Sequence, residues 1–325
     1  MPINYPIKFT PILKERIWGG NKLHKLLGKE AQDYPVGESW EISTVPGSVS
    51  IVANGELKGT SLQKLIDTYK AAFLGEDIYT KYGTKFPLLI KYIDAKTDLS
   101  VQLHPNDALA QKRHNCFGKE EMWYIMQSDA DSHLYFGFNQ ELSKEDYQKH
   151  LANKTLASVL HNEKVKKEAV YQIPTGRVHA IGAGVVLAEI QQSSDITYRL
   201  YDWDRKDANG KLRELHTEQA LDAIDFKVPE HFQTHYQDKE NIYVPLIETA
   251  YYKTKVLHLT TKKQVATSSK DSFSIYMCVE GKGNFFTDHY DVPIKMGECV
   301  LIPASFPKYT IKPEGSMKLL YIKAV

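Results

Sequence analysis

The stretch LSVQLHP, residues 99–105, alternates strictly between apolar and polar side chains. Side chains in a β-strand point to opposite faces in turn, so Ser100, Gln102 and His104 share one face of this strand. The apolar side chains between them share the other face. A polar row inside a filled apolar core would be costly, whereas it suits a barrel that holds a polar site. The stretch therefore predicts a β-barrel with a site in its interior.

Two further stretches supply side chains for such a site. KEEMWYIM, residues 119–126, reads as a strand with Lys119, Glu121 and Trp123 on one face. A short strand at residues 170–173 leads into the turn PTGRVH, which ends at His179. We expect both stretches to lie close to the first strand.

The residue types of these stretches match a metal site. The imidazoles of His104 and His179 and the carboxylate of Glu121, with the Gln102 amide in reach, suit zinc or a similar divalent ion. Three or four protein ligands leave positions open for water or substrate, which is typical of a catalytic site. A closed structural site would more often use four cysteines or histidines. The pattern therefore predicts a catalytic metal centre.

Short apolar or alternating runs, broken by Gly, Pro, Asn and Asp, occur along most of the chain. Examples at residues 86–93 and 184–190 read as strands, and strands at such spacing favour a barrel or sandwich. Helical patterns occur at 61–69, from Ser143 with a break towards Leu160, and at 217–224. The fold is therefore expected to be mainly β, with a few short helices.

A weak internal repeat suggests a second barrel of the same type. PTGRVH at residues 174–179 has the frame P-x-G-x-x-H, and PASFPK at 303–308 keeps this frame with Ser for Gly and Lys for His. In the second copy, Ser274 and Lys308 occupy the frames that Glu121 and His179 hold in the first. Only the first copy is therefore predicted to bind metal.

Composition restricts the classes of partner. The 325 residues carry 41 Lys+Arg and 40 Asp+Glu, a net charge of +1, which argues against a nucleic-acid partner. The three cysteines form no C-x-x-C pair, and the N-terminal sequence resembles no signal peptide. No apolar run approaches the roughly 18 residues of a membrane span. We expect a cytoplasmic protein with no membrane partner.

These stretches resemble those of a known family, the type I mannose-6-phosphate isomerases of the cupin superfamily. The likeness covers most of residues 10–215, and its later part is similar to the short bacterial branch. The last hundred residues match only as a degenerate cupin domain. The resemblance is carried by residues 17–20, 37–41, 86–91, 99–105, 118–124, 174–182 and 189–205.

The resemblance implies a mainly β fold of double cupin (jelly-roll-like) β-barrels with a small helical insertion. A catalytic cupin domain would span residues 1–228, with the insertion at about 141–168. A degenerate, metal-free cupin β-domain would span residues 229–325. It further implies one zinc ion per chain, bound by four residues: Gln102, His104, Glu121 and His179.

The implied reaction interconverts mannose 6-phosphate and fructose 6-phosphate through a cis-enediol. It needs a base near C1 and C2, stabilisation of negative charge on the two oxygens, and a grip on the phosphate; zinc can polarise the carbonyl. The family's active-site arginine falls on Arg199. A structural alternative for Arg199 is a salt bridge with Asp195 or Asp202.

Four other residues are candidates for the site. Glu189 is either the proton-transfer base or a residue that orients Arg199 or a zinc histidine. Lys119 can act as acid, base or phosphate contact, or simply balance a carboxylate. Lys91 and Ser100 are candidate phosphate contacts, and Lys91 needs a partner because it interrupts an apolar run.

Two rival functions fit the same fold. One is another metal-dependent cupin enzyme, because ligand sets overlap between metals. The other is a non-catalytic sugar-phosphate-binding cupin, which would be expected to have a broken ligand set. A monomer and a homodimer are both compatible with the sequence.

Overall fold

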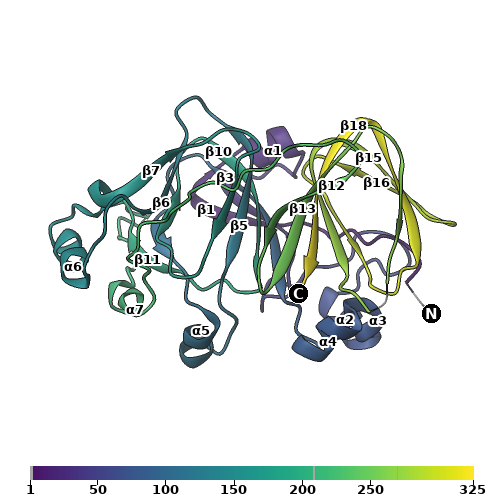
Figure 1. Ribbon diagram of the computed structural model, residues 1–325, viewed down its shortest axis with the longest axis horizontal. Coiled ribbons are helices and arrows are strands. Elements are labelled where there is room, and N and C mark those ends of the chain that lie inside the picture. Colours follow the sequence, from purple (N-terminus) through teal and green to yellow (C-terminus); the bar gives the residue numbers. More distant parts are fainter. Residues whose placement is uncertain (1–2, 208, 269) are drawn as a thin grey trace.

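The computed structural model describes residues 3–207, 209–268 and 270–325. Two β units lie side by side along the long axis of the molecule (Figure 1). Strands from the first two thirds of the chain form one unit, and strands from the last third form the other. The chain is mainly β, and the expected double cupin arrangement is confirmed.

The first unit consists of two antiparallel sheets that together make a jelly roll rather than one closed barrel, as far as the described residues show. The six-stranded sheet has the order β1 (Ile12–Gly20), β2 (Val36–Ile42), β3 (Leu88–Ala95), β10 (Val185–Gln192), β5 (Glu121–Ser128), β8 (Val170–Ile173). The five-stranded sheet has the order β11 (Tyr198–Tyr201), β4 (Val101–Leu103), β9 (His179–Ile181), β6 (His133–Phe138), β7 (Leu160–Lys164).

The second unit is a single seven-stranded antiparallel sheet that bends through its two long strands, β15 and β18. Its main path runs β12 (Tyr243–Glu248), β13 (Tyr252–Leu259), β18 (Lys308–Ala324), β15 (Ser274–Phe286), β16 (Asp291–Lys295). Two shorter strands pair off this path, β14 (Lys263–Ala266) with β18 and β17 (Cys299–Ile302) with β15.

Register shows that the two units repeat one another. Glu121 pairs with Ile173 in the first unit, and Ser274 pairs with Ile302 in the second. Ser274 therefore stands in the frame of Glu121, as the sequence predicted. The second interior is filled by aliphatic and aromatic side chains, including hydrogen-bonded Tyr276 and Tyr309. The division at residues 228/229 and the metal-free character of the second unit stay predictions.

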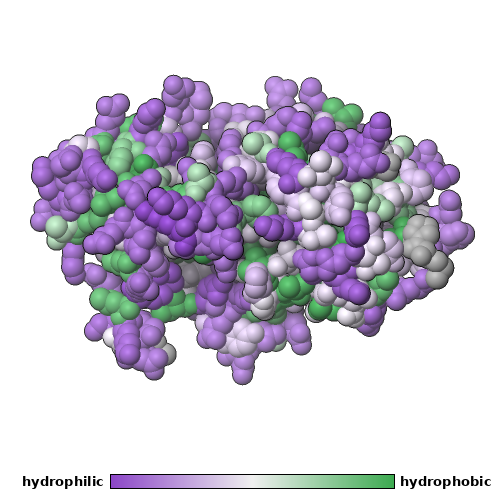
Figure 2. Space-filling view, turned by 90° about the horizontal axis from the view of Figure 1, so that it is seen from below, coloured by the Kyte–Doolittle hydropathy of each residue, from purple (hydrophilic) through white to green (hydrophobic). Residues whose placement is uncertain are grey.

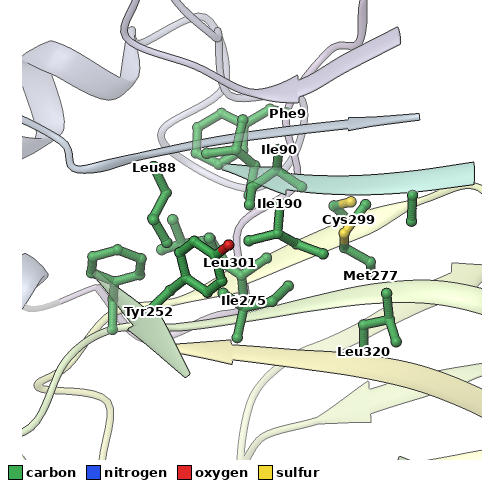
Figure 3. Packing of buried hydrophobic residues seen from close by; sticks show 14 of the residues in the cluster. Phe9, Leu88, Ile90, Ile190, Tyr252, Ile275, Met277, Cys299, Leu301 and Leu320 are labelled. Atoms are coloured by element: carbon green, nitrogen blue, oxygen red, sulfur yellow. The ribbon is translucent and has the colours of Figure 1, made fainter. Parts of the chain in front are cut away.

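Both sheets of the first unit are covered on their outer faces. The outer face of the six-stranded sheet packs against the second unit, where Ile90 and Ile190 meet Tyr252, Ile275 and Leu301 (Figure 3). The outer face of the five-stranded sheet carries Val101 and Leu103 and lies under α6 (Lys144–Ala152), the 3-10 helix η1 (Leu156–Val159) and α7 (Thr217–Leu221). Leu99, expected in the same outward row, instead packs with Trp123 in the interior cluster. The inner faces are thus left to form the site.

The three predicted helical regions are present. Ser61 caps α2 (Leu62–Tyr69) through Lys64 N, and Ser143 caps α6 before the break that leads to η1. The third, α7, ends at Leu221, before the predicted end at residue 224. Four helices were not predicted: α1 (Lys22–Leu27), α3 (Ala71–Leu74), α4 (Glu76–Tyr82) and α5 (Asp107–His114).

One face of the molecule is mainly hydrophilic, and hydrophobic residues occur there in small separate patches among polar ones (Figure 2). Among the described residues, none of the helices has both the length and the apolar character needed to span a bilayer.

Candidate metal centre

Three buried side chains from three strands converge between the two sheets of the first unit. His104 follows β4, Glu121 begins β5 and His179 begins β9, and each is 1% exposed. Their ligand atoms all lie within 4.8 Å of one another. The carboxylate lies between the imidazoles, with Oε1 at 3.4 Å from His104 Nε2 and Oε2 at 3.7 Å from His179 Nε2. The sequence predicted this convergence.

Hydrogen bonds fix which ring nitrogens face the cluster. His104 Nδ1 donates to Ile196 O at 2.9 Å, and His179 Nδ1 donates to Arg177 O at 2.8 Å. Each Nε2 is thereby left with its lone pair directed at the cluster. Glu121 Oε2 and His179 Nε2 are buried without a hydrogen-bond partner among the described residues. Unpaired buried acceptors are expensive, so this arrangement fits an ion that these atoms would bind.

The protonation states also suit a cation. Burial and the Lys119 charge lower the pKa of His104, and burial and His104 lower that of His179 to about 3. Burial alone would raise the pKa of Glu121, but the Lys119 charge, together with the adjacent His104, outweighs it and holds that pKa well below its ordinary value. Neutral imidazoles beside a carboxylate are the forms that coordinate metal ions.

Gln102 lies next to this cluster. It pairs directly with His179 across β4 and β9 and with Arg199 across β4 and β11. Directly paired residues project from the same face of a sheet, so Gln102 stands between His179 and Arg199. Its Oε1 accepts a hydrogen bond from Ser100 Oγ at 3.4 Å. Gln102 therefore lies on the same sheet face as His179, next to the cluster.

A cavity of about 530 Å³ opens beside the cluster, and Gln102 and Lys119 link the two. The three buried ligand candidates are not among the residues that line it. Its wall carries more cations than acids, as expected for a site that receives an anionic ligand. The charged and histidine residues of the lining are Arg16, Glu38, Lys91, His114, Lys119, Glu189, Asp195, Arg199, Arg213 and His216.

Lys119 lies between the cluster and the cavity. Its Nζ is 2.6 Å from Glu121 Oε1 and 3.1 Å from His104 Nε2. The side chain is 6% exposed, so its charge is shielded from solvent. Of the alternatives considered from the sequence, Lys119 balances the charge of the Glu121 carboxylate, and its side chain also faces the cavity.

Glu189 and Lys91 form a buried ion pair on the inner face of the six-stranded sheet. Lys91 Nζ is 3.0 Å from Glu189 Oε1, and Trp123 Nε1 donates to Glu189 Oε2 at 2.9 Å. The indole of Trp123 meets the His179 ring edge to face, with centroids 5.3 Å apart. Among the described residues, Glu189 contacts neither Arg199 nor a candidate metal histidine directly. It acts on His179 only through Trp123.

Arg199 is half-buried on β11 at the cavity wall. Its Nη1 donates to Glu214 O at 2.7 Å, and Nε has no hydrogen-bond partner among the described residues. The salt bridge considered from the sequence is not formed, because Asp202 instead pairs with Arg205 and Arg213. Arg199 thus lines the cavity without a carboxylate partner among the described residues.

Sequence reasoning missed part of this wall. Arg16 and Glu38 form a bidentate pair, with Nε–Oε1 and Nη2–Oε2 distances of 3.1 and 3.2 Å, and Trp40 Nε1 donates to Glu38 Oε2 at 2.6 Å. His114, which is exposed, also lines the cavity and shares a 2.8 Å hydrogen bond with the Tyr198 hydroxyl. His216 also lines the cavity. Of these residues, only Glu38 and Trp40 lie in a stretch that carried the family resemblance, residues 37–41.

The fold and the cluster together define a cupin with a candidate open metal centre. Two family models match the chain: "Phosphomannose isomerase type I, catalytic domain" at residues 7–124, and "Mannose-6-phosphate isomerase, cupin domain" at residues 245–322. The first match lies within the first β unit, and the second match lies within the second β unit.

Whole-chain similarity extends this match. The mannose-6-phosphate isomerase ManA of Bacillus subtilis is 36% identical over 94% of this chain and 96% of its own length. The Streptococcus mutans mannose-6-phosphate isomerase is 38% identical over 69% of each chain. A crystal structure of the mannose 6-phosphate isomerase from Bacillus subtilis superposes with a TM-score of 0.88 and 31% identity, covering 98% of this chain and 99% of that one. The chain belongs to the type I mannose-6-phosphate isomerase family and is an isomerase.

Proposed function

We propose that this chain interconverts mannose 6-phosphate and fructose 6-phosphate through a cis-enediol, with one Zn²⁺ as cofactor. The observation that carries the proposal is the buried His104–Glu121–His179 cluster beside a cation-rich cavity of about 530 Å³. Membership of the isomerase family supports the substrate pair. A non-catalytic sugar-phosphate binder would need neither the oriented Nε2 atoms nor the unpaired Glu121 oxygen.

We propose His104, Glu121, His179 and Gln102 as the zinc ligands. Two imidazoles, a carboxylate and an amide match the nitrogen and oxygen preference of zinc, and leave room for substrate. When bound, the ion would supply a Lewis acid that polarises the substrate carbonyl and offsets charge on O1 and O2. The hydrogen bonds of His104 and His179 to backbone carbonyls hold the rings in the required tautomer.

The remaining roles follow from the cavity wall. Arg199, with its unpaired Nε, would stabilise negative charge on the substrate. We propose Lys119 and Glu189 for moving the proton between C1 and C2, since both face the cavity and burial raises the pKa of Glu189. Ser100 and Lys91 are proposed substrate contacts on the same wall.

The rest of the proposal concerns the whole chain. A catalytic unit would span residues 1–228, and residues 229–325 would form a metal-free unit that covers its outer face. The three cysteines are all free thiols, which fits a cytoplasmic enzyme. The partner would be the sugar phosphate alone, and the chain would act as a monomer or homodimer.

One assay tests the function. Purified protein should convert mannose 6-phosphate to fructose 6-phosphate, lose this activity on chelation and regain it with added zinc. Full activity of the metal-free protein would overturn the metal assignment, and no conversion by the zinc-loaded protein would overturn the reaction.

Variants separate the roles. His104→Ala and His179→Ala should lose bound zinc, measured by elemental analysis, together with activity. Arg199→Ala should keep zinc while kcat falls at least about 100-fold, in line with loss of a charge-stabilising donor. Exposed His235 supplies the control, since His235→Ala should keep both zinc and activity. An Arg199→Ala variant as fast as the parent would contradict the role given to Arg199.

Proton transfer has its own test. Turnover in tritiated water should label C1 or C2 of the sugar, because the abstracted proton can exchange with solvent. Lys119→Met and Glu189→Gln should each abolish labelling if the residue carries the proton. Labelling that continues at the parent rate in one of them would remove that residue from the transfer.

A further inference from the structure

His216 is bound to Arg199 through the backbone and through its own ring. The Arg199 backbone N–H donates to His216 Nδ1 at 3.1 Å, and the His216 N–H donates to Arg199 O at 2.7 Å. The Arg199 side chain donates to Glu214 O, two residues before His216. His216 is also the N-cap residue of helix α7, and its carbonyl accepts a hydrogen bond from Ala220 N at 3.0 Å. The ring of His216 is therefore fixed by its own hydrogen bond and by those of the backbone N–H and C=O groups of the same residue.

This arrangement fixes the chemical form of the ring. Nδ1 accepts a hydrogen bond and carries no hydrogen, so a neutral His216 must carry it on Nε2. Burial, followed by the Arg199 charge, lowers the pKa of His216 and favours the neutral form. The side chain lines the cavity, and Nε2 has no partner among the described residues. His216 therefore offers the cavity a neutral N–H donor.

Sheet register places this donor away from the metal cluster. His179, Gln102 and Arg199 form one cross-strand row on β9, β4 and β11, and His216 lies beyond Arg199. Neighbouring strands are about 4.8 Å apart, so Arg199 lies roughly 10 Å along the row from His179. A hexose 6-phosphate reacts at C1 and C2 and carries its phosphate at the opposite end. The outer end of the row is thus the place for the phosphate.

We propose that His216 serves this reaction with both ring nitrogens: Nδ1 positions Arg199, and Nε2–H donates to a phosphate oxygen of the substrate. The proposal deepens the proposed function and rests on it for the identity of the substrate. It requires no proton transfer by His216. Its role differs from that of a general base, because the ring keeps one tautomer throughout.

The tautomer is measurable without turnover. Two-bond ¹H–¹⁵N correlation spectra of protein labelled with ¹⁵N-histidine, with His216→Asn used for assignment, should show His216 protonated at Nε2 and unprotonated at Nδ1. Hydrogen on Nδ1, or on both nitrogens at pH 7.5, would overturn the proposal even in a catalytically silent protein.

Two substitutions separate the two nitrogens. In His216→Asn the amide oxygen can replace Nδ1 as acceptor, whereas His216→Phe keeps the ring but leaves the Arg199 N–H unpaired. We expect kcat to fall at least 10-fold in the Phe variant and less than 3-fold in the Asn variant. His235→Asn, at an exposed position, should match the parent. Equal kcat values in the two His216 variants would overturn the positioning role.

Binding of inorganic phosphate tests the donor independently of catalysis. Both His216 variants lack Nε2–H, so the Kd for phosphate, from calorimetry of the zinc-loaded protein, should rise at least 3-fold in each. An unchanged Kd in both would overturn the contact. If the parent does not isomerise mannose 6-phosphate, the proposed function fails, while the tautomer and the phosphate affinity still decide the role of His216.

Discussion

Glu38 is a buried carboxylate whose charge should contribute measurably to stability. Burial alone would raise its pKa, but the charges of Lys91 and Arg16 and the hydrogen bond from Trp40 Nε1 outweigh burial and lower it from 4.5 to about 2. The side chain is 12% exposed, while that of Arg16 is 35% exposed. Replacing Glu38 by Gln keeps the shape and removes the charge.

The magnitude follows from linkage. A pKa of about 2 in the folded state against 4.5 when unfolded corresponds to about 3 kcal/mol at 1.4 kcal/mol for each unit of pKa. Partial exposure of Arg16 reduces this to about 2–3 kcal/mol. Because the folded pKa is the lower one, the contribution is complete above about pH 5 and is lost as the pH falls towards 2. At pH 4 it should already be smaller by roughly 1 kcal/mol.

Urea unfolding of parent and Glu38→Gln at pH 7, 5 and 4 measures this contribution. Chelator in every sample keeps metal occupancy out of the comparison. Glu15 lies on the neighbouring strand β1 with an exposed side chain, and Glu15→Gln should change the unfolding free energy by less than about 0.5 kcal/mol at each pH. A Glu38→Gln loss below 0.5 kcal/mol at pH 7, or one that grows as the pH falls, would refute the reasoning.

Three further substitutions test a helix cap, a glycine with positive φ and an ion pair between the two units. Ser61→Ala removes the N-cap of α2 and should lower the unfolding free energy by about 1 kcal/mol, whereas Ser61→Asp should restore it. Gly75 has φ of 96°, and a Cβ there would overlap the Asp271 carbonyl, so Gly75→Ala should cost more than about 2 kcal/mol in thermal or urea unfolding. Buried Lys318 holds Glu168 of the first unit at 2.7 Å, and Lys318→Met should cost about 1–2 kcal/mol. A Lys318→Met protein as stable as the parent at 0.1 M salt would show that this ion pair contributes nothing.

Much of the β architecture could be predicted because strand signals are local. Alternation at residues 99–105 correctly placed Val101 and Leu103 under α6 and α7 and Gln102 on the inner face, but it was wrong for Leu99, which packs in the interior cluster and lines the cavity. The helices α3 and α4 were missed because their stability is tertiary. Phe73 and Leu74 pack against the second unit, and Ala304 N and Phe273 N bond to their carbonyls. Nothing within residues 71–82 indicates that contact.

The candidate site also has a part that could be predicted from the sequence and a part that could not. The metal cluster was predictable because each member follows from strand alternation or a short turn within its own stretch. The cationic wall was only partly predictable: Lys91, Lys119 and Arg199 were candidates from the sequence, but the rest of the wall depends on the order of strands in space. Arg16 enters through β1, at the edge of the six-stranded sheet, and His216 through the segment before α7. His114 is exposed, and its place at a polar helix end did not reveal that it also adjoins the cavity.

Comparison of the two units indicates how the candidate metal centre should affect the stability of the first unit. Where the first unit has Glu121 and Trp123, the second has Ser274 and Tyr276 at the same register, within a largely apolar interior. The fold therefore forms without a polar interior. Buried Glu121 and His179 hold unpaired atoms, which should destabilise the first unit when the proposed ion is not bound. A ligand that binds only the folded state stabilises it, so the binding energy of the metal should offset this cost and appear as resistance to unfolding as well as catalysis.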